Sequence, residues 1–122
     1  MSEFKPASAV IWVEIPVTNL ENSRAFYGTV LQNELTIQEM GPMPTAVFSY
    51  KEGGVGGHLY VGKPGTAGTG NIVHFSVNAP LEAGLERVKS AGGQVVSDIV
   101  AIPDGRFAYC LDLDGNSFGL FV

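Results

Sequence analysis

The chain has 122 residues and a mass of 12.9 kDa, with 45% hydrophobic and 16% charged residues. These values are typical of one globular domain that can bury a core without disulfides. Twelve Asp and Glu against seven Lys and Arg give a formal charge of −5. This charge argues against a nucleic-acid partner, which would require a basic face, and is compatible with a neutral or cationic small ligand.

The sequence shows no features of a membrane-spanning or secreted protein. No apolar run approaches the roughly 20 residues that a membrane span needs, and the N-terminus lacks the pattern of a signal peptide. The one cysteine, Cys110, cannot form an internal disulfide, and it lies in an apolar run where a free thiol behaves as a small hydrophobic side chain. We therefore expect no membrane partner and a reducing, cytoplasmic location.

The first half of the chain predicts one strand, one helix and three further strands. Aliphatic residues alternate over residues 9–17, with Ala9, Ile11, Val13, Ile15 and Val17 on the face expected to enter the core. The capping-box pattern over residues 18–21 predicts a helix from residue 20 to about residue 32. The next strands are expected over 35–40, 45–50 and 58–61, with turns at the GPMP segment and in a glycine-rich hairpin.

The second half repeats this pattern. Residues 63–70, KPGTAGTG, are small and polar and predict a linker. A strand over 71–77, a helix from Pro80 to Gly92, and strands within 94–102 and over 107–111 and 117–122 follow. The order is therefore βαβββ, linker, βαβββ, with an offset of about sixty residues between the halves. We predict a single α+β domain over residues 1–122, with module one at about 7–62 and module two at 71–122.

Strand parity separates a core face from an opposite face in each module. Each helix must cover the aliphatic face of its sheet, so Leu59 and Val61 are expected in the core. The opposite, concave face is predicted to carry Trp12, Glu14, His58, Tyr60, Ile72, His74, Ser76, Ser117, Gly119 and Phe121. Gly119 is unusual there, because glycine within a strand is disfavoured unless another group approaches closely.

Several of these side chains are candidates for a binding or catalytic site. Glu14 and His74 are equivalent at the repeat offset, and they could hydrogen-bond to each other or act as an acid–base pair. Trp12, Tyr60 and Phe121 could line a pocket for a planar ligand or fill it. Asp112 and Asp114 lie in a DLDGN segment that favours a turn over a calcium site. Arg106 is interpreted as a solvated loop charge or as a guard at the pocket mouth.

Two segments carry a resemblance to a known family. The IPVTNLENSRAFYGTVL segment that opens module one and the LDLDGNSFGLF segment near the end of module two resemble the vicinal oxygen chelate superfamily. That superfamily includes glyoxalase I, extradiol dioxygenases, fosfomycin-resistance thiol transferases and bleomycin-resistance proteins. The resemblance implies the glyoxalase/bleomycin resistance fold, in which paired modules form a curved cup. It also implies a homodimer, because dimerisation commonly completes the pocket in this superfamily.

The resemblance implies four metal ligands, one from each of four strands. Carried over by position, these fall on Trp12, His58, Ile72 and Gly119, of which only His58 has a suitable donor atom. We therefore expect no metal at the usual positions and no cofactor, which puts metal-dependent chemistry in doubt. A displaced set of Glu14, His58 and His74 would still provide two imidazoles and one carboxylate for Fe, Zn or Mn.

Two functions are consistent with these residues. The first is a glyoxalase/bleomycin-resistance-like protein that binds a small molecule in a concave pocket, through Trp12, Glu14, His58, Tyr60, His74 and Phe121. The alternative is a glyoxalase-related enzyme of the lyase, isomerase or dioxygenase type. That enzyme would use the displaced metal set, or would use Glu14 and His74 as acid and base.

Overall fold

The first module forms a four-stranded sheet with one helix. The structure, a computed structural model, describes residues 3–122. Module one comprises β1 (Trp12–Val17), α1 (Leu20–Leu31), β2 (Thr36–Met40), β3 (Met43–Val47) and β4 (Gly56–Val61). The strand order is β1-β4-β3-β2, with β1 and β4 parallel and the other pairs antiparallel.

The second module repeats this arrangement with one strand divided. It comprises β5 (Val73–Ser76), α2 (Leu81–Ser90), β6 (Gln94–Val95), β7 (Val100–Ile102), β8 (Gly105–Leu111) and β9 (Ser117–Phe121). The sheet order is β5-β9-β8-β6, and β7 also pairs with β8. Again the first strand is parallel to the last, since β5 and β9 run in the same direction. The predicted α+β fold with two related halves is confirmed.

The ends of several predicted strands were wrong. β1 begins at Trp12 because its partner β4 begins opposite it at Gly56. Ile11 is consequently 81% exposed instead of entering the core. β3 begins at Met43, inside the segment predicted as a turn, because only Gly41 and Pro42 are needed to connect it to β2.

Two further expectations on strand structure also failed. Val61 lies at the end of β4 and is 46% exposed, so it does not join the core. The strand expected within residues 94–102 is divided into β6 and β7, and both pair with β8. Between them the Ser97 hydroxyl accepts a hydrogen bond from the backbone N–H of Tyr109 at 2.9 Å, in a segment without continuous strand pairing.

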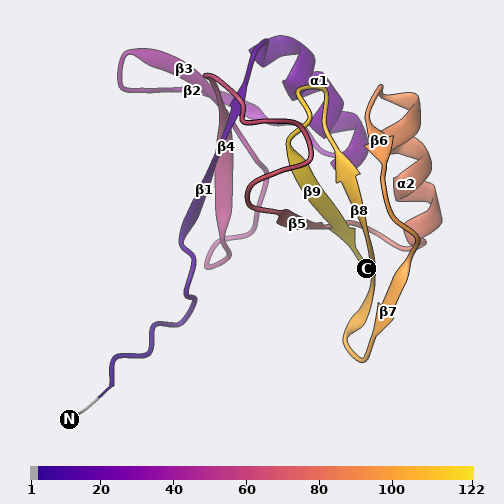
Figure 1. Cartoon of the computed structure of the whole chain (residues 1–122). Helices are drawn as coiled ribbons and strands as arrows, with labels where there is room; N and C mark the ends of the chain where they lie inside the picture. Colours follow the sequence, from indigo (N-terminus) through magenta and orange to yellow (C-terminus); the bar gives the residue numbers. More distant parts are fainter. Residues whose placement is uncertain (1–2) are drawn as a thin grey trace.

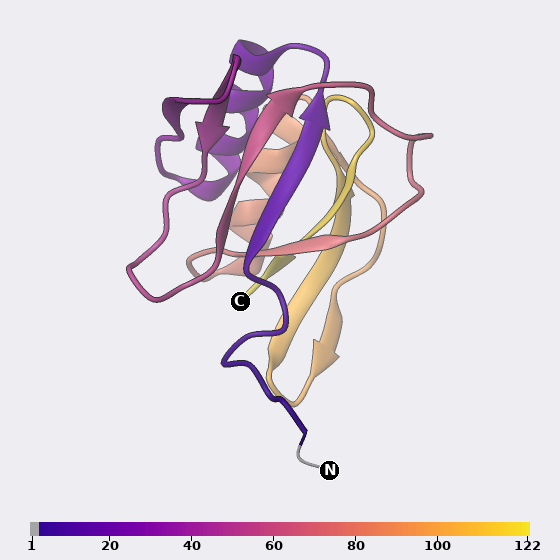
Figure 2. The same ribbon diagram turned by 90° about the vertical axis from the view of Figure 1, so that its left-hand side faces the viewer.

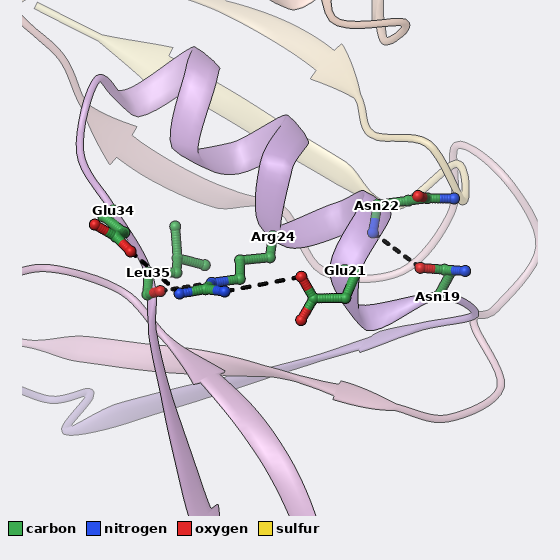
Figure 3. Close-up of polar contacts among 6 residues, drawn as sticks. All are labelled: Asn19, Glu21, Asn22, Arg24, Glu34 and Leu35. Carbon is green, nitrogen blue, oxygen red and sulfur yellow. Dashed lines mark hydrogen bonds and ion pairs between the residues drawn. The ribbon is translucent and has the colours of Figure 1, made fainter.

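Local interactions fix the two ends of α1. The Asn19 side chain accepts a hydrogen bond from the backbone N–H of Asn22 at 2.9 Å, which caps the helix (Figure 3). The Arg24 guanidinium donates to the carbonyl of Leu35 at 2.8 Å and so ties the helix to the segment leading into β2. At the C-terminal end, Gln32 adopts the left-handed conformation with φ 58°.

The two modules share one hydrophobic core. Both helices lie on the same side of the strands, behind β1 and β4 in the view of Figure 2. Tyr27 of α1 has ring contacts within its own module, to Phe48, and across to Phe75 and Phe118 of module two. Burial of such rings supplies most of the stabilisation of a domain of this size. The faces turned away from the helices are therefore left free to form a site.

A buried polar network joins the modules beside this core. The Tyr27 hydroxyl donates to the Asp112 carboxylate at 2.6 Å, and Asp112 also accepts from the backbone N–H groups of Asp114 and Asn116, both at 2.9 Å. Burial, together with the neighbouring Asp112 charge, raises the pKa of Tyr27 well above its usual value. The Asn116 amide then donates to the carbonyl of Pro16 at 2.9 Å. Asp112 thus organises a turn, as the sequence predicted.

Cys110 lies in the same core with no exposed surface. Burial raises the pKa of its thiol to about 11, because an apolar environment disfavours the thiolate. The thiol is therefore a packing group, in agreement with the sequence interpretation. Within residues 3–122, neither helix has the length and apolar character needed to cross a membrane.

Candidate functional site

A cleft of about 1320 Å³ is lined by β1, by β5 and by the loops that precede β4 and β5. β1 pairs with β4 and β5 pairs with β9, and in residues 3–122 neither strand has a second partner. The free edges of both strands line the cleft. Its lining includes Trp12 and Glu14 from β1, Tyr50 from the loop before β4, and Ile72 and His74 from the β5 region.

One end of this cleft is tied together by side chains. The hydroxyl of Thr18, just after β1, donates to the Asp114 carboxylate at 2.6 Å, and the Thr18 backbone N–H donates to the same carboxylate at 3.2 Å. Asn116 and Ser117, which follow Asp114, are part of the cleft lining. The turn between β8 and β9 therefore holds the carboxyl end of β1 against module two.

On the module-one face, three predicted site residues form a connected chain. The Trp12 indole N–H donates to Nδ1 of His58 at 2.8 Å, and Nε2 of His58 lies 3.1 Å from Oε1 of Glu14. Register explains this contact, because Glu14 and His58 are direct partners in the pairing of β1 with β4. The His58 side chain is only 6% exposed, whereas that of Glu14 is 66% exposed. Tyr50 packs edge-on against Trp12.

On the module-two face, His74 lies among aromatic rings. It makes edge-to-face contacts with Phe107 and Tyr109 at centroid distances of 5.3 and 5.7 Å. It also covers Gly119, its register partner in β9, where an added Cβ would lie 2.3 Å from Nδ1 of His74. The close approach expected from a glycine within a strand is therefore made by the His74 imidazole.

The predicted site residues thus divide into two groups. Trp12, Glu14 and His58 are joined by hydrogen bonds, and Tyr60 packs against His58 at a centroid distance of 6.2 Å. His74 and Phe121 lie on the other sheet, where Phe121 stacks on Phe107. The expected hydrogen bond between Glu14 and His74 does not form in the described residues, because Glu14 bonds to the neighbouring strand instead.

The residues at the positions that the resemblance assigns to metal ligands do not fit a divalent metal. The side chains of Trp12 and Ile72 have no lone pair suited to bind a metal, Gly119 has no side chain, and both nitrogens of His58 are already hydrogen-bonded. The displaced set of Glu14, His58 and His74 is not assembled either. Within residues 3–122, no three His, Cys, Asp or Glu side chains come close enough together to bind a metal ion.

Three neighbours of the site escaped the sequence interpretation. Phe107 and Tyr109 both contact His74. Alternation along β8 could have identified them, because the intervening and following residues, Ala108 and Cys110, are buried. Tyr50 lies outside the strands and had no such signal. Its ring occupies the space beside Gly56, where an added Cβ would lie 2.4 Å from it.

Known structures share this arrangement of strands and helices. The chain matches a glyoxalase/bleomycin resistance protein from Albidiferax ferrireducens with a TM-score of 0.70 and 20% identity, covering 93% of this chain and 98% of that one. It matches the fosfomycin resistance protein FosX from Mesorhizobium loti with a TM-score of 0.67 and 17% identity, over 97% and 93% of the two chains. Glyoxalase I from Zea mays matches with a TM-score of 0.67 and 21% identity, over 91% of this chain and 44% of that chain.

At these identities the structural matches establish the fold and nothing finer. A search of curated proteins for relatives gave no match. The family model described as the Glyoxalase/Bleomycin resistance protein/Dioxygenase superfamily matches residues 9–120. The chain therefore belongs to this superfamily, as the sequence resemblance predicted.

Proposed function

We propose that this protein binds a small molecule in the cleft between β1 and β5 without the divalent metal that its superfamily often uses. The observation that carries this proposal is the replacement of donor side chains at three of the four ligand positions, by Trp12, Ile72 and Gly119. The engagement of His58 by two hydrogen bonds supports it further. The aromatic lining of both faces supplies the apolar contacts that a small organic ligand requires.

Metal analysis of protein purified without chelator tests the first part. We expect less than stoichiometric transition metal, and no change in thermal stability with excess Zn, Mn, Fe or Ni, because metal binding to the folded state would raise the melting temperature. A stoichiometric metal that is lost in His58→Ala would overturn the proposal. That result would favour the displaced metal set.

Ligand binding is the second part, and the chain provides its own reporter. Trp12 is the only tryptophan, and it lines the cleft. A panel of aromatic amines, alcohols and acids should include compounds that change Trp12 emission and shift the amide signals of β1 and β5 in two-dimensional NMR spectra. Shifts confined to residues away from the cleft would contradict the proposed site.

The alternative function is a glyoxalase-related enzyme that uses Glu14 as a base. It is favoured by the exposure of the Glu14 carboxylate, which is 66% exposed beside the cleft and is held by a buried imidazole. Turnover of an α-ketoaldehyde thiol adduct, a catechol or an epoxide that is lost in Glu14→Gln would establish it. Unchanged turnover in that variant would exclude Glu14 from the reaction.

A second copy of the chain is the proposed partner, in a cytoplasmic setting. Large apolar side chains are exposed around the cleft, among them Val10, Val55 and Ile72 at 55%, 43% and 46%. Such a patch is typical of an interface. Light scattering should give twice the mass of 12.9 kDa, and Ile72→Glu should shift the mass toward the monomer.

Cell fractionation tests the proposed cytoplasmic location, which the buried free thiol of Cys110 supports.

A further inference from the structure

The two hydrogen bonds of His58 determine which of its ring nitrogens carries the proton. An indole N–H can only donate, so Nδ1 of His58, 2.8 Å from Nε1 of Trp12, must accept. An ionised carboxylate can only accept, so Nε2, 3.1 Å from Oε1 of Glu14, must donate. Both contacts are satisfied together only by the neutral imidazole with its proton on Nε2.

Burial gives the three side chains different roles. At 6% exposure the His58 side chain is shielded from a ligand, whereas the Glu14 side chain is 66% exposed and lines the cleft. In the described part of the chain, the second oxygen of Glu14, Oε2, receives no hydrogen bond. That oxygen remains free to accept a hydrogen bond from a bound molecule.

Resting on the proposed binding function, we propose that His58 is a positioning residue that holds the Glu14 carboxylate for a ligand with a cationic N–H group. The contacts with Trp12 and Glu14 both select the same His58 tautomer, His58 donates to Oε1, and Oε2 accepts from the ligand. A cationic donor is favoured because hydrogen bonds between opposite charges are the stronger kind. The aromatic rings of Trp12 and Tyr50, which line the same cleft as Glu14, add a surface that attracts cations.

The tautomer is tested first, on the ligand-free protein. The chain has two histidines, so in His74→Gln the remaining imidazole signals of 15N-labelled histidine belong to His58. We expect long-range 1H–15N correlations of the Nε2–H tautomer. Because either Trp12 or Glu14 is enough to select this tautomer, a mixture of tautomers is expected only when Trp12→Phe and Glu14→Ala are combined. A dominant Nδ1–H tautomer, or a pattern that this combination leaves unchanged, would overturn the proposal.

Binding is tested second, with three probes that share one ring: benzylammonium, benzyl alcohol and benzoate. Glu14→Gln should weaken benzylammonium binding about tenfold, since a charged hydrogen bond is lost, and should leave benzyl alcohol within about twofold. Glu52→Gln is the matched control, because it removes the same charge from an exposed loop residue. A similar loss in Glu52→Gln would assign the effect to net charge and contradict the proposal.

The positioning role is separated from packing by two substitutions at His58. Glutamine can accept from Trp12 through its oxygen and donate to Glu14 through its nitrogen, whereas leucine can do neither. His58→Leu should weaken benzylammonium binding about fivefold, and His58→Gln should restore it to within about twofold of the wild type. Equal losses in the two variants would reduce His58 to a packing residue.

The two proposals can fail separately. Binding of all three probes at the cleft with no effect of Glu14→Gln or His58→Leu would leave the binding function standing and reject the role of His58. An Nε2–H tautomer that is lost only when Trp12 and Glu14 are both replaced, without binding of any probe, would retain the hydrogen-bonded chain and reject its use for this class of ligand.

Discussion

The two modules place different chemistry at equivalent positions of the same fold. Glu14 and His58 are register partners in β1 and β4, and His74 and Gly119 are the corresponding partners in β5 and β9. In module one, His58 on the inner strand β4 donates a hydrogen bond to the exposed carboxylate of Glu14 on the edge strand β1. In module two, the inner strand β9 carries Gly119, and the imidazole of His74 on the edge strand β5 lies over it.

This difference shows that the repeat conserves backbone geometry and leaves the exposed face free to vary. The core faces are alike, since Ile15 and Leu59 in one module and Leu120 in the other are buried aliphatic residues. On the opposite faces, the choice of side chain is limited only by the space beside the side chain of the neighbouring strand. The module-one face carries a hydrogen-bonded chain beside its aromatic rings, whereas the module-two face carries His74 packed against aromatic rings.

The largest expected effect is at the network that joins the modules. Asp112→Ala removes the acceptor for Tyr27, for two backbone N–H groups and for the Asn116 amide. We expect a loss of about 3 kcal/mol in the free energy of unfolding, because buried donors are left without partners. Urea denaturation measures it. Asp104→Ala, in an exposed turn, is the control and should change stability by less than about 0.5 kcal/mol; equal effects would disprove a special role for Asp112.

Gly119→Ala should act on module two alone. The new Cβ would lie 2.3 Å from Nδ1 of His74, so the imidazole must leave its place against Phe107 and Tyr109. Overpacking of this kind costs about 1–2 kcal/mol, and adding His74→Ala should relieve much of the cost. A double-mutant cycle in urea measures this coupling. Additive losses would show that His74 does not occupy the space above Gly119. As a control for an effect limited to module two, the NMR signals of Glu14 and His58 should not move in Gly119→Ala.

Helix capping gives a smaller contrast between the modules. Asn19 caps α1 through its side chain, whereas the residue at the same place in α2, Pro80, makes no side-chain cap. Asn19→Ala should cost about 1 kcal/mol of unfolding free energy. Asn78→Ala, in the exposed segment before α2, should be nearly neutral, and thermal unfolding of both variants measures the difference. Equal losses of unfolding free energy in Asn19→Ala and Asn78→Ala would show that the Asn19 cap has no special role.

The smallest expected effect is a pH dependence confined to module two. The hydrogen bonds donated by Arg106, at 2.9 and 3.0 Å, lower the pKa of Glu82 to about 2 from its usual 4.5. A depressed pKa in the folded state stabilises the protein above the unfolded-state pKa, and this contribution is lost as pH falls from about 4.5 toward 2. Glu82→Gln should therefore flatten the stability profile in that window only. A difference that persists unchanged across the window would contradict the ion pair as its cause.

Much of the fold could be predicted from local patterns. Period-two alternation placed Ile15 and Val17 in the core, and the residues before α1 predicted its start, because these signals depend on neighbours along the chain. The ends of strands were less predictable. β1 is limited by where β4 begins, so the exposure of Ile11 depends on a strand more than forty residues away.

The sequence by itself determined the repeat, the faces of most strand residues and the superfamily, and it predicted that three of the four positions assigned to metal ligands lack a suitable ligand atom. Only the tertiary structure decided which of the facing side chains meet. Glu14 bonds to His58, 44 residues away, and Tyr27 bonds to Asp112, 85 residues away. Parity assigns a side chain to a face but not to a partner. The partner depends on the register of β1 against β4 and on how the two modules share their core.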